Sequence, residues 1–169
     1  MISLHQTKAC TMSVAFRRES DEEHKEPRFE LPIPPGPNVV TQRGYGLIQA
    51  RVEELEVEVA QADTDEQRAE RNRDLRYWRA RLTSAQIAPA ASGETVAIGT
   101  RVTIEQDELT RTLSIVGHDE ADPSAGLIAF SSPLGRALMG AEPGDEVEAP
   151  GTGDQIRIIT IDPIKEDRS

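Results

Sequence analysis

Two stretches in the first half of the chain place apolar residues at the spacing of an α-helix. In both, these residues follow one another at steps of three and four positions, as in the seam of a coiled coil: Tyr45, Ile48, Val52, Leu55, Val59 and Ala62 in the first, and Leu75, Trp78, Leu82 and Ala85 in the second. Between them "ADTDEQ" breaks the pattern, and Thr64 with Gln67 can form the capping box of a new helix. The pattern predicts an antiparallel helical hairpin over residues 38–88. Its arms would be about 30 Å long, and its tip would be polar because Arg68 and Arg71 take the apolar positions there.

A second pattern, of short β-branched stretches, follows a linker at residues 89–93. Gly and Pro separate these stretches, which is typical of strands joined by turns: "TRVTIEQ", "TRTLSIVG", "LIAFSS", "DEVEAP" and "QIRIITIDPI". One segment differs from them, because Ser132 followed by Pro133 is a helix start signal and Gly140 is an end signal. The pattern predicts an α+β domain over residues 94–165, with one short helix among its strands.

The two ends of the chain differ from the middle in composition. Residues 1–37 combine the charged "RRESDEEHKEPRFE" with the proline-rich "LPIPPGP". Such a composition buries too little apolar surface to offset the entropy lost on folding. We therefore expect a disordered or extended arm there, with either Met1 or Met12 as the start, and a short tail at residues 166–169.

Charge and cysteine content narrow the classes of function. The net charge of −11 argues against a surface that follows nucleic-acid phosphates, and we expect no direct sequence-specific nucleic-acid binding. The single cysteine, Cys10, excludes a cysteine-based metal cluster and an internal disulfide. No apolar run approaches the roughly 20 residues that span a bilayer, and no secretory signal is evident. We expect a cytoplasmic protein with no membrane partner. It also shows no nucleophile–base pair or phosphate-binding loop, so we expect no enzyme and no cofactor of its own.

Three motifs in the C-terminal half resemble one protein family. "IVGHDEAD" at 115–122, "SPLGRALMG" at 132–140 and "GDEVEAPG" at 144–151 are similar to the C-terminal domain of the bacterial transcript-cleavage factors GreA and GreB. In that family the patterns are IVG-x-DEAD, S-P-[ILM]-[AG]-RAL-x-G and GD-x-V-x-x-P-x-G. Upstream, "VTQRGYGLIQARVEELE" resembles the first helix of the family, with its Thr-x-x-Gly opening. The resemblance covers roughly residues 38–165.

The resemblance implies a fold and a partner. The C-terminal domain would be an FKBP-like twisted antiparallel sheet crossed by the short helix. It would dock at the rim of the secondary channel of RNA polymerase core enzyme, and the hairpin would enter the channel. Acidic residues at the hairpin tip would then help the polymerase hold a second Mg²⁺ and position the water that cleaves backtracked RNA. A two-metal site of this kind stabilises the attacking and leaving oxygens.

The hairpin tip departs from the family pattern. The acidic motif GD-x-x-ENA-x-Y is missing, and the hairpin is several turns shorter. The tip carboxylates Asp63, Asp65 and Glu66 are the candidates for assisting catalysis, although acidic residues in a helical first turn are also ordinary capping residues. Two activities therefore stay open: stimulated RNA cleavage, or occupation of the channel without cleavage. A stand-alone protein-interaction module, such as a hairpin that dimerises through its seam, is a third reading, but we expect a monomer.

The family motifs also supply candidates for polymerase binding. These residues lie in the acidic turn and at the start of the short helix: Asp119, Glu120, Asp122, Ser132, Pro133 and Arg136. The acidic turn is expected to be structural and is also a candidate for contact with the polymerase. Arg136 can either pin that turn or bind a carboxylate of the partner, and the first is favoured. His118 is expected to be a solvated turn residue, and Trp78 to pack in the hairpin core.

Overall fold

The computed structural model describes residues 31–165 of the 169-residue chain. Residues 31–37 form neither helix nor strand, and most of the arm predicted at residues 1–37, like the tail at 166–169, lies outside the described residues. The helices and strands follow in this order: β1 (Val39–Val40), α1 (Gln42–Ala60), α2 (Asp65–Ser84), β2 (Gln86–Ile87), β3 (Thr100–Gln106), β4 (Leu109–Val116), the 3-10 helices η1 (His118–Glu120) and η2 (Pro123–Ala125), β5 (Leu127–Ala129), α3 (Pro133–Leu138), β6 (Glu146–Glu148) and β7 (Gln155–Pro163).

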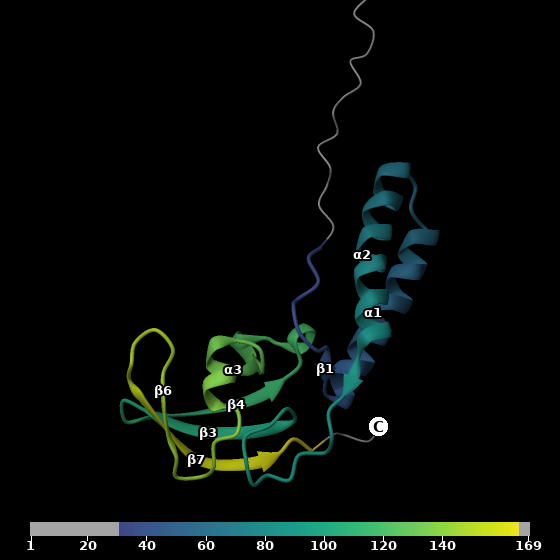
Figure 1. Cartoon of the computed structure of the whole chain (residues 1–169). Coiled ribbons are helices and arrows are strands. Elements are labelled where there is room, and N and C mark those ends of the chain that lie inside the picture. The colour runs from purple at the N-terminus through teal and green to yellow at the C-terminus, as the bar shows by residue number, and fades with distance from the viewer. Residues whose placement is uncertain (1–30, 166–169) are drawn as a thin grey trace, which may run out of the picture.

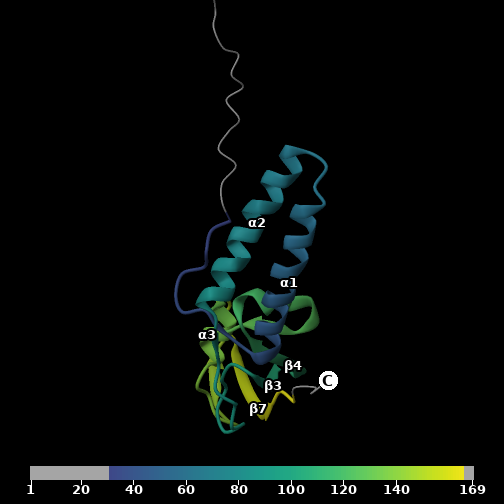
Figure 2. The ribbon, with the colours of Figure 1, turned by 90° about the vertical axis from the view of Figure 1, so that its right-hand side faces the viewer.

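The helices α1 and α2 form the predicted antiparallel hairpin, which stands away from the sheet (Figures 1 and 2). Each helix begins at a threonine whose side chain accepts a hydrogen bond from a backbone N–H, Thr41 from Gly44 and Thr64 from Gln67, as the capping rule predicts. The apolar seam forms a small core in which the following side chains meet: Val52, Leu55 and Leu75, with Val59, Trp78 and Leu82 partly buried around them.

Ion pairs replace apolar contacts toward the tip of the hairpin. Arg71 Nε lies 3.2 Å from Glu58 Oε2, and the neighbouring residues of α2 are exposed or half-buried. The prediction of a polar tip is therefore confirmed. Trp78 was expected in the core, and its side chain does pack on the seam, but it is only half-buried.

The C-terminal part is a five-stranded sheet in the order β5-β4-β3-β7-β6. The pairs β3/β4, β3/β7 and β6/β7 are antiparallel, whereas β4 and β5 run parallel. The α+β class is confirmed, but a wholly antiparallel sheet is wrong. The reason is the connection after β4: a direct hairpin would reverse the chain, and η1 and η2 instead carry it back to Ser114, near the end of β4, beside which β5 begins in the same direction. Parallel strands need such a crossover.

The core of this domain lies on one face of the sheet. It contains buried residues from the strands and their connections: Val96, Ile98, Val102, Ile104, Ile115, Ile128, Leu138, Ala141, Ala149, Ile156, Ile158 and Ile161. Helix α3 contributes Leu138, which is fully buried. The Ser132 side chain caps α3 by accepting from Gly135 N at 3.0 Å. The predicted short helix is thus confirmed, at Pro133–Leu138.

A two-stranded parallel sheet closes the base of the hairpin. Val39 and Val40 of β1 pair with Gln86 and Ile87 of β2, so the chain is tied together just before α1 and just after α2. The tip loop lies at the far end of the hairpin from the sheet domain (Figure 1). This arrangement makes the hairpin a projecting arm and its base a junction with the sheet domain.

Candidate functional site

The junction between hairpin and sheet domain is built on η1, the turn that contains the acidic motif. Asp119 accepts hydrogen bonds at both carboxylate oxygens: Tyr77 Oη donates to Oδ1 at 2.8 Å, and Arg81 Nε donates to Oδ2 at 2.6 Å. The side chains of Arg81 and Asp119 are 3% and 5% exposed. Both donors come from α2, so Asp119 attaches the second helix of the hairpin to the sheet domain.

Arg81 continues this network to the segment before α1. Its Nη2 donates to Asn38 Oδ1 at 2.5 Å, and Asn38 Nδ2 donates back to the Arg81 carbonyl at 2.6 Å. Among the described residues, no buried side-chain nitrogen or oxygen lacks a hydrogen-bond partner. A buried charge is tolerated only under that condition, since an unpaired one costs far more than a lost surface contact.

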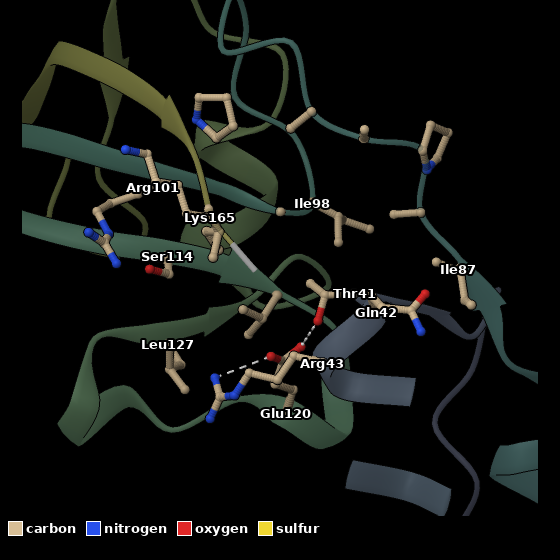
Figure 3. A pocket seen from close by; sticks show the side chains of 18 residues that line it. Thr41, Gln42, Arg43, Ile87, Ile98, Arg101, Ser114, Glu120, Leu127 and Lys165 are labelled. Carbon is tan, nitrogen blue, oxygen red and sulfur yellow. Dashed lines mark hydrogen bonds and ion pairs between the residues drawn. The ribbon is translucent and has the colours of Figure 1, made fainter. Parts of the chain in front are cut away.

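Glu120, the next residue along η1, attaches the first helix. Its Oε2 accepts from Thr41 Oγ1 at 2.6 Å, and its Oε1 lies 3.3 Å from Arg43 Nη1. The Glu120 side chain is 3% exposed. Thr41 is also the N-cap of α1 and accepts from Gly44 N at 2.9 Å, so one hydroxyl group joins the helix start to the acidic turn (Figure 3).

Two glycines allow these elements to approach closely. A Cβ at Gly44 would lie 2.7 Å from Glu120 Oε2, and a Cβ at Gly117 would lie 3.0 Å from the Val39 carbonyl oxygen. Contacts this short are not compatible with a side chain unless the neighbouring atoms shift. Gly44 was noted in the sequence only as part of the Thr-x-x-Gly opening, and the structure explains the need for glycine there by the position of the Glu120 carboxylate.

A cleft of about 970 Å³ opens beside the junction (Figure 3). It lies between the start of α1, the linker after β2 and the end of the sheet, and Ile87, Ile98 and Leu127 form part of its apolar wall. Arg43 lines it from the hairpin side, and Arg101 and Lys165 line it from the sheet side. The cleft therefore has a cationic rim in a chain whose net charge is −11.

The electrostatics of the acidic turn follow from these contacts. Burial, together with the hydrogen bond to Asp119 and the charge of that carboxylate, raises the pKa of Tyr77 to about 12. Asp122 lies outside the junction and is exposed. It caps η2, and the hydroxyl of Ser124 together with two backbone N–H groups lowers the pKa of its carboxyl group.

The three acidic residues at the tip are exposed. Arg68 Nη1 donates to Asp65 Oδ1 at 2.9 Å, and Arg68 Nη2 donates to the Ala62 carbonyl at 3.1 Å. Asp63 lies in the loop, and Asp65 and Glu66 lie in the first turn of α2. Within residues 31–165 no group of three His, Cys, Asp or Glu side chains could hold a metal ion. The tip carboxylates thus do not form a metal site by themselves.

The residues predicted to bind polymerase separate into two groups. Asp119 and Glu120 are buried in the junction, whereas Pro133 and Arg136 of α3 are exposed and Ser132, its N-cap, is half-buried. Arg136 does not pin the acidic turn, so that expectation is wrong. Its Nη1 donates to the Ser131 carbonyl at 2.5 Å, and Arg81 and Arg43 hold the turn instead. The role of the predicted residues of the acidic turn and of α3 in polymerase binding stays a prediction.

Sequence reasoning missed the buried partners of the acidic turn. None of Arg81, Asn38 and Tyr77 was singled out from the sequence. The signal available was weak: Tyr77 directly precedes Trp78, and Arg81 directly precedes Leu82, in the apolar seam of α2. His118, by contrast, is exposed as expected.

Within the described part of the chain, no helix is both long enough and apolar enough to span a lipid bilayer.

Comparison with known proteins gives a family match for the sheet domain. Residues 91–163 match the family model described as "Transcription elongation factor, GreA/GreB, C-term". A transcription elongation factor GreA of Desulfovibrio desulfuricans is 42% identical over 77 residues, which are 43% of this chain and 48% of that protein. A GreA of Polaromonas naphthalenivorans is 42% identical over 89 residues, covering 48% of this chain and 56% of that protein. The matched part of the chain thus spans about half the length of these curated relatives.

The solved structures that match share less sequence with this chain. The GreA factor homolog 1 (Gfh1) protein of Thermus thermophilus is 20% identical, and the match covers 75% of this chain and 99% of that chain with a TM-score of 0.38. A GreA/GreB elongation factor of Nitrosomonas europaea is 22% identical, with coverages of 73% and 97% and a TM-score of 0.37. The assignment of the domain rests on the match of residues 91–163 to the family model, and this range does not include the hairpin.

Proposed function

Because residues 91–163 match the C-terminal domain model of the GreA/GreB transcription elongation factors, we propose that the chain regulates transcription elongation by binding the core enzyme of bacterial RNA polymerase. It acts through the polymerase and has no chemistry of its own. The observation that supports this proposal is that the chain combines a domain matching the GreA/GreB model with a helical hairpin, which is joined to it by the buried Arg81–Asp119 ion pair and by the ion pair between exposed Arg43 and buried Glu120. A regulator that must reach into another protein needs both a docking domain and a rigid arm.

The sheet domain docks at the rim of the secondary channel, and the hairpin enters it. The docking surface includes the exposed start of α3, with Pro133 and Arg136. The hairpin suits this use because its 19- and 20-residue helices extend for about 30 Å, and because its tip is the part farthest from the sheet domain (Figure 1). The protein acts as a monomer, since one copy supplies both parts.

Channel occupation, with weak or absent RNA cleavage, is the activity we propose. Stimulated cleavage requires carboxylates that can share Mg²⁺ with the polymerase at about 2.1 Å. The tip lacks the acidic motif of the family, and Asp65 is already hydrogen-bonded to Arg68. Any Mg²⁺ involved would belong to the polymerase site, and Asp63, Asp65 and Glu66 would be the only tip candidates to contact it.

Transcript cleavage in a backtracked elongation complex tests this proposal. Labelled RNA is followed after addition of this protein, of a GreA protein, or of both. We expect no shortening with this protein alone, and a dose-dependent loss of the GreA-stimulated cleavage when it is in excess. Arg136→Glu is the matched variant: it reverses an exposed charge on α3 whose guanidinium donates to the Ser131 carbonyl of the same segment, so it should weaken the competition without affecting folding.

Two results would overturn parts of the proposal. Robust shortening by this protein alone would restore the cleavage-factor reading, and Asp65→Ala combined with Glu66→Ala should then abolish the activity. Excess protein that neither binds core enzyme nor lowers GreA-stimulated cleavage would favour a stand-alone interaction module.

A further inference from the structure

We propose that Asp119 and Glu120 are positioning residues: together they fasten both helices of the hairpin to η1 and so set the direction in which the tip projects. The two carboxylates are adjacent in sequence, yet they serve different helices. Asp119 accepts from Tyr77 and Arg81 of α2, whereas Glu120 accepts from Thr41 and Arg43 at the start of α1. A change in hairpin direction must break one of these two sets of bonds.

Directional bonds and apolar contacts both make this connection, since Val39 and Ala88 at the base of the hairpin pack against the apolar cluster of the sheet domain. The described residues contain two separate apolar clusters, one inside the hairpin and one inside the sheet domain. Apolar contact is not directional, so Val40 and Ile48, which are also buried, can tolerate small rotations. Hydrogen bonds weaken steeply away from their preferred angle. The four bonds to η1 therefore define the angle between hairpin and sheet far more narrowly than the surrounding packing does.

Backbone packing supports the same conclusion. The Glu120 carboxylate occupies the space that a side chain at residue 44 would take, at 2.7 Å from an added Cβ, and a Cβ added at Gly117 would lie 3.0 Å from the Val39 carbonyl oxygen of β1. Thr41 connects the two features because it caps α1 and donates to Glu120. The first turn of α1 and the acidic turn thus form one unit whose parts cannot move independently.

The length of the arm amplifies any change at the junction. For an arm of about 30 Å, a tilt of 10° moves the tip by about 5 Å. On the proposed function, a tip displaced this far would miss the polymerase site it is meant to occupy. Only this loss of contact with the polymerase site rests on the proposed function, because the direction of the hairpin is a property of the free protein.

The distance distribution between two spin labels tests the inference on the whole, free chain. With Cys10 replaced by serine, labels are attached at Gln61→Cys on the tip and at Glu148→Cys on β6, both exposed positions. Double electron–electron resonance then gives the distance distribution for three proteins: the parent, the double variant that combines Asp119→Asn and Glu120→Gln, and the single variant Asp122→Asn. Asp122 belongs to the same motif, but its bonds stay within its own turn, so Asp122→Asn is the matched control.

We expect a narrow distribution for the parent and for Asp122→Asn, and a distribution that is broadened or shifted by several ångströms for the double variant at unchanged helix content. A folded double variant with the distribution of the control would overturn the inference. If the double variant does not fold, Tyr77→Phe tests the inference, because it removes only the hydroxyl group that donates to Asp119. A distance distribution broader than that of the parent would support the inference, and an unchanged distribution would contradict it. Failure of the parent to bind polymerase would overturn the proposed function and leave this result standing.

Discussion

Replacing Arg81 by methionine should destabilise the protein strongly. The substitution keeps much of the side-chain volume but removes the guanidinium from the Asp119 carboxylate, which is 5% exposed, and from Asn38, which is also 5% exposed. Removing one partner of a buried ion pair typically costs about 3–5 kcal/mol, because the other charge stays buried without compensation. In a protein of this size a loss of that order lowers the melting temperature by on the order of 10 °C.

A double-mutant cycle separates the ion pair from general damage to the junction. Arg81→Met combined with Asp119→Leu removes both charges, and replacement of a buried pair by apolar residues is often neutral or stabilising. The double variant should therefore be more stable than Arg81→Met alone. Urea unfolding gives the free energies, with the fluorescence of Trp78, the single tryptophan, reporting on the hairpin and far-UV circular dichroism on the whole chain.

The same substitution on an exposed pair is the control. Arg157 Nη2 lies 2.8 Å from Glu146 Oε1, with both side chains about half exposed, and Arg157→Met should cost less than about 1 kcal/mol. If Arg81→Met costs no more than this control, or if the double variant loses as much as the two single variants added together, the buried pair does not hold the junction and the reasoning fails.

Four further outcomes follow from the structure. Trp78→Ala should cost about 2 kcal/mol in urea unfolding, less than for a fully buried tryptophan, because Trp78 is half-buried; no change would contradict its packing on the seam. Glu108→Gly should raise stability by about 1 kcal/mol, because Glu108 has a left-handed φ of 62° in a two-residue hairpin that favours Asp-Gly; a loss would refute this geometry. Between pH 10 and 12 the stability should fall, because the pKa of Tyr77 is about 12 when folded and about 10 when unfolded, and Tyr77→Phe should not show this loss. A fragment of residues 92–169, which contains nearly all of the sheet-domain core, should fold and bind core polymerase more weakly than the whole chain; a folded fragment without binding would move the docking site to the hairpin.

Local signals made the elements predictable from the sequence. The capping residues Thr64 and Ser132 and the apolar periods gave the hairpin, the short helix and the strand positions, because each depends on residues a few positions apart. The two-residue strands β1 and β2 could not be found in this way. They are too short for an alternating pattern, and their pairing depends on the hairpin bringing distant residues together.

The junction could not be predicted for a related reason. The hydrogen bond from Arg81 to Asp119 joins residues 38 positions apart, and that from Thr41 to Glu120 joins residues 79 positions apart. A charged residue gives no local sign that it will be buried, since arginine and aspartate are exposed in most proteins. The acidic motif was therefore predicted to bind a partner protein, although the carboxylates of Asp119 and Glu120 contact the hairpin of the same chain. For Arg136, proximity in sequence to the acidic turn suggested an ion pair there, whereas its guanidinium donates to the Ser131 carbonyl.

Comigration with core RNA polymerase tests the central claim most directly. The full chain, labelled at Cys10, is passed over a sizing column with bacterial core enzyme, and a GreA protein is then added in excess. We predict that the label elutes with the polymerase and that GreA displaces it, because both would occupy the same channel. A label that elutes alone, or that stays with the polymerase when GreA is in excess, would contradict binding at the secondary channel.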